Sequence, residues 1–215
     1  VYYSDFSENP KIEDVYTGIE IFNRERCDCC ISIGGGSVLD MGKLICYLRE
    51  DPTNNPNRLV KNEVFDISRK THLIAIPTTS GSGAESTHFS VVYINNRKYS
   101  LAHKTILPDI VNINAKLSYT LNPYLKAVTG LDALAQSIES YWSRNATLQS
   151  RRYSTTAIKL IWSNLLKSVL DNDFSAHSNV VVGSNFAGRA INIAKTTAAH
   201  AISYYFSSKH KISHG

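Results

Sequence analysis

The stretch "CISIGGGSVLDMGK" at residues 30–43 joins a short apolar run to a helical pattern through three consecutive glycines. Glycine tolerates tight turns and close approach of other groups, at a cost in conformational entropy. A strand that passes through such a turn into a helix presents free N–H groups and the positive end of a helix dipole, which favours an anion. Because GGGS is not the GxGxxG dinucleotide fingerprint, a tight turn without a ligand explains this stretch nearly as well.

A second glycine loop, "IPTTSGSGAEST" at residues 76–87, follows the apolar pattern "THLIAIP". It combines Gly81 and Gly83 with hydroxyl side chains, which are Thr78, Thr79, Ser80 and Ser82. Loops at the carboxyl ends of neighbouring parallel strands face one crevice, where open α/β sheets bind ligands. The two glycine loops are therefore expected to share one binding site, and the alternative is a Ser/Thr-rich surface loop.

The patterns around these loops predict two domains. Short buried strands, "CCISI", "THLIAIP" and "DIVNIN", alternate with helical patterns, which favours a mostly parallel α/β sheet. A hairpin of "FSVVYI" and "KYSLA" is expected around Asn95-Asn96, and a Pro/Asn loop at 49–58. The later chain has only helical patterns, at 123–143, 151–171, 176–194 and 196–207. We therefore predict an α/β domain at 1–118 and an all-helical domain at 119–215.

Composition limits the classes of partner. No apolar run approaches eighteen residues, which argues against a membrane span. The net charge of +5 is scattered, without the basic stripe and aromatics of a nucleic-acid surface. The four cysteines are at 27, 29, 30 and 46, and the run "CDCC" has no second CxxC to pair with and no His at zinc-ligand spacing, which favours free thiols in a reducing cytoplasm. The chain starts at Val1 and stops at Gly215 without start or stop signals, so we expect material to be missing at both ends.

Three motifs in this order, "GGGSVLDMGK", "PTTSGSGAEST" and "TGLDALAQSIESY", resemble those of the iron-containing (group III) alcohol dehydrogenase family. Glycerol dehydrogenase and dehydroquinate synthase are related to that family. "NPKIEDVYTGIEIF" and "LPDIVNINAKL" extend the resemblance to essentially the whole chain. It implies a dehydroquinate synthase-like fold, with a Rossmann-like dinucleotide-binding domain and a helical metal-binding domain. It also implies a homodimer, and the absence here of a first strand–helix segment and of the end of the helical domain.

The resemblance implies NAD or NADP as the cofactor. The pyrophosphate is expected at the first glycine turn, the second loop is expected to line the cofactor's path, and one acid and one lysine are expected near the nicotinamide ribose. The matching residues are Gly35, Gly36, Ser37, Thr78, Thr79, Ser82, Asp40 and Lys98. The acidic residue that separates NAD from NADP is expected upstream of Val1.

The resemblance also implies a divalent metal, Fe2+ or Zn2+, bound in the helical domain. The family's ligands are an Asp, a His four residues later and two further His. Asp132 matches the first, and His200 and His214, fourteen positions apart, match the last two. Gln136 takes the place of the remaining His, and its amide oxygen would bind such a metal more weakly than an imidazole.

Three protein ligands and a water still form a catalytic metal site. Gln136 is therefore expected to be a weak ligand, a group that contacts a ligand, or a substrate contact. The alternative from spacing alone is that Asp132 is a surface acid of a helix and that the histidines belong to the core.

The implied activity is that of a metal-dependent, NAD(P)-linked alcohol dehydrogenase or aldehyde reductase, with no catalytic side chain beyond the metal site. The helical-domain motifs look most like the branch that reduces phosphonoacetaldehyde. Lys195 precedes His200 by about one and a half helical turns if the helix is continuous, and would then face an anionic substrate. The open alternatives are a dehydroquinate-synthase-like lyase or glycerol-dehydrogenase-like enzyme on the same fold, and a metal-free, inactive binding homologue.

Overall fold

The computed structural model describes residues 1–51, 55, 57–60, 67–210 and 212–215, and these form two compact units. The sheet unit comprises Val1–Ile76 and Thr87–Asn112, and the helical unit comprises Pro77–Ser86 and Ile113–Gly215. The second glycine loop therefore packs with the helices. The loop expected at 49–58 lies partly outside the described residues, and the domain boundary at 118–119 stays a prediction.

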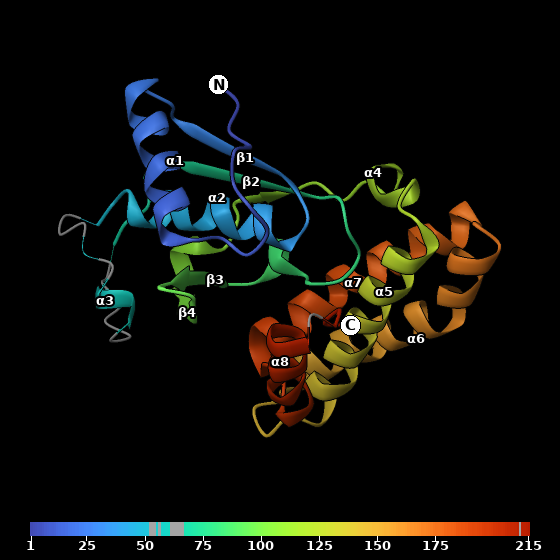
Figure 1. The fold of residues 1–215 in the computed structure, drawn as a ribbon. Helices are drawn as coiled ribbons and strands as arrows, with labels where there is room; N and C mark the ends of the chain where they lie inside the picture. The colour runs from blue at the N-terminus through green and yellow to red at the C-terminus, as the bar shows by residue number, and fades with distance from the viewer. Residues whose placement is uncertain (52–54, 56, 61–66, 211) are drawn as a thin grey trace. The chain divides into compact units, whose positions relative to one another are not determined.

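A three-stranded sheet organises the sheet unit (Figure 1). Its order is β1 (Cys29–Gly34), β2 (His72–Pro77) and β5 (Ile110–Val111), and β2 pairs in parallel with β5, with Ile74 opposite Ile110. The expected parallel arrangement is confirmed for this pair.

The expectation that the first strand is a buried strand is wrong for two of its apolar residues. Ile31 and Ile33 are 56% and 57% exposed, whereas Ser32 between them is 4% exposed. Side chains alternate between the two faces of a strand, and in the described chain only one face of β1 is covered. The apolar run of β1 thus reflects β-branched residues on an open face as well as residues in the core.

Two helices build the core of the sheet unit. Helix α1 (Ile12–Arg24) buries Val15, Ile19 and Phe22 at helical spacing, as its pattern predicts. Helix α2 (Gly36–Leu48) is buried almost throughout its second half. Both pack with residues of the hairpin in one apolar cluster. Each large apolar side chain buried in this way contributes roughly 1.5–3 kcal/mol to folding.

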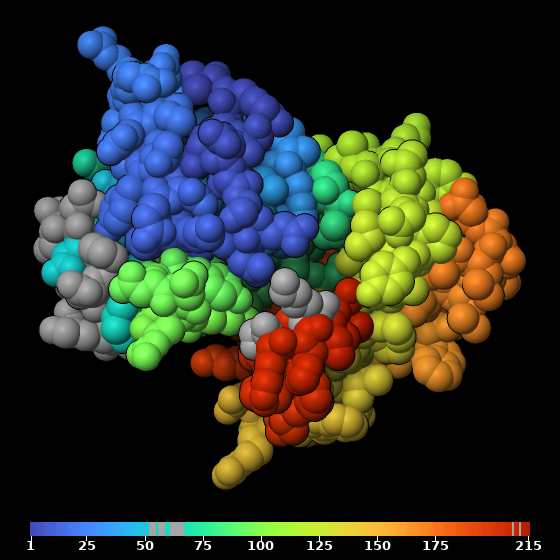
Figure 2. Space-filling view, in the orientation of Figure 1, coloured from blue at the N-terminus to red at the C-terminus, as the bar shows by residue number. Residues whose placement is uncertain are grey.

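The predicted hairpin is confirmed as β3 (Phe89–Ile94) and β4 (Arg97–Ala102), which pair antiparallel. Asn95 and Asn96 have φ values of 50° and 60°, and a two-residue turn with both φ positive matches the twist of the strands. The N–H of Tyr93 donates to the carbonyl of Pro10 at 2.8 Å, so the hairpin joins the N-terminal segment. Figure 2 shows the green hairpin against the blue start of the chain.

Helices account for most of the helical unit, and the four predicted from the sequence are confirmed. They are α5 (Pro123–Trp142), α6 (Leu148–Leu170), α7 (Phe174–Ala194) and α8 (Ala198–His210), with a short α4 (Lys116–Tyr119) before them. Side chains of Asn122, Thr147 and Asp173 accept backbone N–H bonds at the starts of α5, α6 and α7. Such caps satisfy donors that the first helical turn leaves unpaired.

The second glycine loop is fixed to α7 by a close backbone crossing. Gly83 has a φ of 60°, and a Cβ added to Gly188 would lie 2.7 Å from the carbonyl oxygen of Gly83. Asn185 donates from Nδ2 to Glu85 Oε1 at 3.0 Å and to Ser86 Oγ at 2.6 Å. Glycines at both positions are therefore explained by packing.

Candidate metal centre

The three ligands expected from the sequence lie together in the helical unit. Asp132 on α5, His200 on α8 and His214 after α8 each offer one ligand atom, and these atoms all lie within 4.8 Å of one another. Asp132 Oδ1 is 3.3 Å from His200 Nε2 and 3.7 Å from His214 Nε2. The interpretation of Asp132 as an isolated surface acid does not fit this geometry.

The segment after α8 is held against α5 by its small last residue and by ring contacts. A Cβ added to Gly215 would lie 2.0 Å from the carbonyl oxygen of Val128, so only glycine fits there. The ring of His214 stacks on Tyr204, with centroids 5.0 Å apart and planes at 10°. Ser203 Oγ lies 3.1 Å from His214 Nδ1. These contacts leave His214 Nε2 on the side of Asp132.

Two buried polar atoms at this site have no hydrogen-bond partner. They are Nε2 of His200 and Oε1 of Gln136, on residues that are 6% and 4% exposed. A buried polar atom without a partner costs about 1–3 kcal/mol. Gln136 lies one helical turn after Asp132, so both project from the same side of α5. A carboxylate, two imidazoles and an amide oxygen fit a divalent transition metal, which would satisfy these atoms.

Glu139 is the residue at this site that sequence reasoning missed. Its Oε1 lies 2.5 Å from His200 Nδ1, and its Oε2 accepts from the N–H and the hydroxyl of Thr197, each at 2.6 Å. Burial alone would raise the pKa of Glu139, but the hydrogen bonds from Thr197 and His200 lower it. Burial alone would lower the pKa of His200, but the carboxylates of Asp132 and Glu139 raise it. The available sequence signal was the helical face shared by residues 132, 136 and 139.

The expected cofactor residues of the first loop lie in the sheet unit. Gly35 is the N-cap of α2, and it makes no side-chain hydrogen bond to the first turn of the helix. Ser37 Oγ accepts from the N–H of Asn9 at 3.1 Å. Gly34 is explained by packing, because a Cβ there would lie 2.5 Å from Val38. The turn at Gly35 and Gly36 keeps its predicted role in binding pyrophosphate.

The carboxyl group of Asp40, in the sheet unit, has a pKa well above the ordinary value of an aspartate. Burial raises its pKa to about 6, although Lys43, the N–H of Val91 and Lys98 act in the opposite direction. The Val91 N–H donates to Asp40 Oδ2 at 3.1 Å. Lys98 lies on β4 with its side chain exposed. The placement of Asp40 and Lys98 beside the nicotinamide ribose stays a prediction.

The remaining predicted residues belong to the helical unit. Thr78, Thr79 and Ser82 lie on the loop fixed to α7, where Ser82 Oγ accepts from the N–H of Ala84 at 3.3 Å. Lys195 is exposed and lies between α7 and α8, with φ 60° and ψ 172°. The continuous helix assumed between Lys195 and His200 is therefore wrong, because α7 ends at Ala194 and α8 begins at Ala198.

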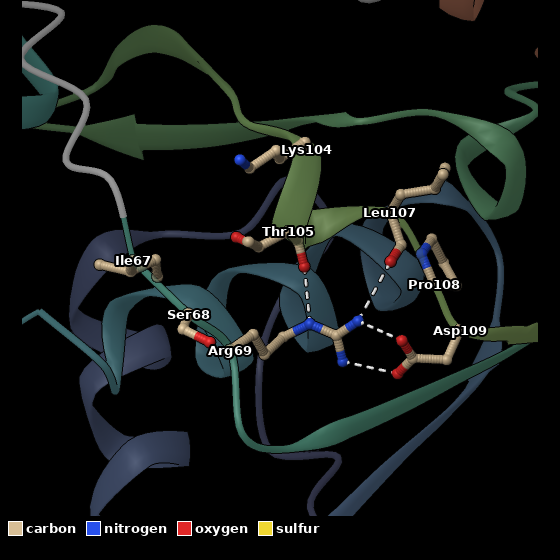
Figure 3. A pocket seen from close by; sticks show the side chains of 8 residues that line it. All are labelled: Ile67, Ser68, Arg69, Lys104, Thr105, Leu107, Pro108 and Asp109. Atoms are coloured by element: carbon tan, nitrogen blue, oxygen red, sulfur yellow. Dashed lines mark hydrogen bonds and ion pairs between the residues drawn. The ribbon is translucent and has the colours of Figure 1, made fainter.

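A hollow of about 690 Å3 in the sheet unit contains none of the predicted site residues (Figure 3). Arg69 dominates it, but its guanidinium donates to the carbonyls of Thr105 and Leu107 and to both oxygens of Asp109. These bonds lower the pKa of Asp109 against the effect of burial. The hollow is thus lined by a structural ion pair, and the guanidinium N–H groups of Arg69 already donate to protein acceptors.

The structure thus combines a sheet unit that has a glycine turn before α2 with a helical unit that gathers an Asp and two His. Residues 1–115 match the family model described as iron-containing alcohol dehydrogenase, and residues 126–215 match the C-terminal model of the same family. The chain belongs to the iron-containing alcohol dehydrogenase family.

Named relatives and solved structures agree with this assignment. A probable alcohol dehydrogenase, EutG, of Salmonella typhimurium is 32% identical over 96% of this chain and 52% of its own length. An NADPH-dependent butanol dehydrogenase of Clostridium saccharobutylicum is 31% identical over 96% of this chain and 54% of its own. A sulfoacetaldehyde reductase of Bifidobacterium kashiwanohense, solved with NAD+, superposes with a TM-score of 0.94 at 28% identity, covering 99% of this chain and 57% of that one.

The chain spans about half the length of these two curated relatives, and it spans a quarter of the aldehyde-alcohol dehydrogenase of Streptococcus pneumoniae. Among the residues that the structure describes, no helix combines the length and the apolar character that crossing a membrane requires.

Proposed function

We propose that the protein of which this chain forms part is a metal-dependent, NAD(P)-linked alcohol dehydrogenase or aldehyde reductase that works as a homodimer. The observation that carries the proposal is the convergence of Asp132, His200 and His214, with His200 Nε2 buried and without a hydrogen bond. An apolar helix bundle has no structural need for an acid and two imidazoles at one point. Binding of Fe2+ or Zn2+ explains all three.

The residues of this chain have separable roles in hydride transfer. A bound metal would supply Lewis acidity toward the substrate oxygen and lower the pKa of an alcohol. Asp132 contributes negative charge, His200 and His214 contribute neutral nitrogen ligands, and Gln136 contributes a weaker oxygen. The turn at Gly35 and Gly36 binds the pyrophosphate through the N-terminus of α2. The other cofactor contacts proposed are Ser37, Asp40, Lys98, Thr78, Thr79 and Ser82.

We propose a small aldehyde with an anionic group, phosphonoacetaldehyde first, as the substrate. The similarity to a sulfoacetaldehyde reductase supports a two-carbon aldehyde with an anionic group on this scaffold. Replacement of a family ligand by Gln136 is consistent with a site reshaped for such a group. Lys195 is the proposed cation for it, although this side chain is solvent-exposed and follows the end of α7.

A substrate panel with the full-length protein tests the function. Phosphonoacetaldehyde, sulfoacetaldehyde, propionaldehyde, lactaldehyde and butyraldehyde are compared with NADH and NADPH in the presence of Fe2+ or Zn2+. We expect net oxidation of the cofactor, fastest with the anionic aldehydes. Equal or faster turnover of the neutral aldehydes would remove the anionic substrate and leave the dehydrogenase.

Metal analysis separates the remaining alternatives. Purified protein that retains no divalent metal and oxidises no cofactor would identify the metal-free binding homologue that Gln136 allows. Comparison of Lys195→Ala with the wild type tests the substrate contact. We expect a loss of about tenfold to a hundredfold in kcat/KM for phosphonoacetaldehyde, as for a lost charge-assisted contact, with butyraldehyde unaffected.

A further inference from the structure

We propose that Glu139 is a positioning residue that sets which nitrogen of His200 faces the metal and anchors the start of α8. This inference rests on the proposed metal centre. Nothing in the sequence patterns assigned a role to Glu139, and its side chain does not belong to the three-ligand cluster. It acts through His200 and Thr197.

The contact between Glu139 and His200 fixes the protonated nitrogen of the imidazole. Oε1 of Glu139 lies 2.5 Å from Nδ1 of His200, with the two side chains 3% and 7% exposed. An ionised carboxylate can only accept hydrogen bonds, so Nδ1 carries the hydrogen. The lone pair available for a metal is then on Nε2, the atom that lies 3.3 Å from Asp132 Oδ1 and has no hydrogen-bond partner.

The second oxygen of Glu139 holds the link between α7 and α8. Oε2 accepts both the N–H and the hydroxyl of Thr197, just before α8 begins. On the other side of the link, Ser143 Oγ donates to the carbonyl of Ala194 at 2.6 Å. Glu139 and Ser143 are four residues apart at the end of α5, so the end of this helix forms hydrogen bonds to both ends of the link.

The link between α7 and α8 depends on these hydrogen bonds because the backbone of the link is strained. Lys195 has φ 60° and ψ 172°, a region that is essentially restricted to glycine. A conformation of this kind persists only where its surroundings over-determine it. The bonds to Thr197 and Ala194 supply that constraint, and the direction of α8, hence the position of His200, follows from it.

A Glu139→Gln variant separates the proposed role from simple packing, because it keeps the shape and removes one acceptor. The N–H of Thr197 is a fixed donor and takes the single amide oxygen. The amide NH2 then faces His200 Nδ1, which must accept, so the hydrogen moves to Nε2. The opposite orientation places the NH2 against the N–H of Thr197. Each orientation of the amide therefore disturbs one contact. With the amide NH2 facing His200, the hydrogen on Nε2 blocks the nitrogen that would bind the metal.

The experiment measures metal affinity and the protonated nitrogen of His200 separately. Zn2+ affinity is determined by chelator competition for the full-length wild type, Glu139→Gln and a control, Glu85→Gln. Glu85 is also buried in the helical unit and accepts from Asn185, but it lies outside the ligand cluster. Loss of a carboxylate behind a histidine ligand typically weakens metal binding about 10–100-fold. We expect this loss for Glu139→Gln and none for Glu85→Gln.

Nitrogen NMR of histidine-labelled, metal-free protein reports the hydrogen directly. We expect it on Nδ1 of His200 in the wild type and its displacement from Nδ1 in Glu139→Gln. Thr197→Val, which removes one hydroxyl and keeps the Glu139–His200 bond, should keep Nδ1 protonated.

Wild-type Nδ1 without a hydrogen would overturn the inference even if Glu139→Gln fails to fold. Unchanged Zn2+ affinity in a folded Glu139→Gln protein would overturn it as well. Failure of the wild type to bind any metal would reject the proposed function, whereas the NMR measurement would still decide the pairing of Glu139 with His200.

Discussion

Nε2 of His200 approaches Oδ1 of Asp132 to 3.3 Å without forming a hydrogen bond to it. The two side chains are only 7% and 12% exposed, so both groups are largely shielded from bulk solvent. Two groups that face one another at this distance without bonding are arranged as ligands of a shared cation are. The proposed metal centre can therefore be tested by substitution of each of its residues.

Asp132→Ala should remove the bound metal and the activity together. The loss removes a charged ligand itself, so we expect metal affinity to fall by more than the roughly 10–100-fold typical of an outer partner. Elemental analysis of the purified protein provides the measurement. Asp171→Ala, at an exposed acid after α6, is the matched control and should keep its metal. A metal content unaffected by Asp132→Ala would reject this residue as a ligand.

Gln136→His should increase the affinity for Fe2+ or Zn2+, because an imidazole binds these metals more strongly than an amide oxygen. Gln136→Leu should instead stabilise the metal-free protein, since it removes a buried oxygen without a partner, by roughly 1–3 kcal/mol. Metal titration and metal-free thermal unfolding measure the two effects. Identical affinity of the His variant and the wild type would show that position 136 does not reach the metal.

The pKa of Asp40 should make the stability of the protein depend on pH. A folded-state value of about 6, above the ordinary 3.8, means that ionisation opposes folding. The resulting loss is absent below about pH 4, grows as the pH rises and is complete above about pH 6. Its size is about 3 kcal/mol at 1.36 kcal/mol per pKa unit.

Asp40→Asn tests this dependence by removing the charge and keeping an acceptor for the N–H of Val91. Denaturant unfolding should show the variant to be more stable than the wild type at neutral pH and equal to it near pH 4. Carbon NMR of the Asp40 carboxyl gives the pKa independently. A midpoint in the ordinary range of an aspartate would contradict the prediction.

Lys195→Gly should stabilise the metal-free protein by on the order of 1 kcal/mol. Relief of a Gly-only backbone conformation gains about 1–3 kcal/mol, and the greater freedom of glycine in the unfolded chain offsets about 0.4–1 kcal/mol. Lys195→Ala keeps the strained backbone and should leave the melting temperature nearly unchanged. Equal melting temperatures for Gly and Ala at this position would show that the backbone there is not strained.

Local pattern and family resemblance each predicted a different part of this structure. The helices and the hairpin follow from periodicity and turn residues. The predicted burial of β1 is the exception, because Ile31 and Ile33 lie on an open face of the sheet. The proposed metal ligands came from the resemblance, because Asp132 and His200 lie on separate helices and no local spacing relates them.

The remaining features depend on tertiary contacts that leave little trace in the sequence. Glu139 shares a helical face with Asp132, but its pairing with His200 requires knowledge of how α5 meets α8. The helical patterns end at 194 and begin again at 196, but they carry no sign of the positive φ at Lys195, a residue that is neither Gly nor Pro. Ser37 precedes a helical pattern like a cap, yet the N–H of Asn9 takes its hydroxyl oxygen.

The close contact of Gly83 with Gly188 limits the substitutions that these two positions tolerate. Both positions already hold the smallest residue, and the contact joins backbone to backbone. A larger residue at one position cannot be compensated by a smaller residue at the other, because no residue is smaller than glycine. The backbone of the loop that carries Thr78, Thr79 and Ser82 is therefore fixed at Gly83 whether or not a ligand is bound. Loss of the proposed cofactor site would leave the requirement for these two glycines in place.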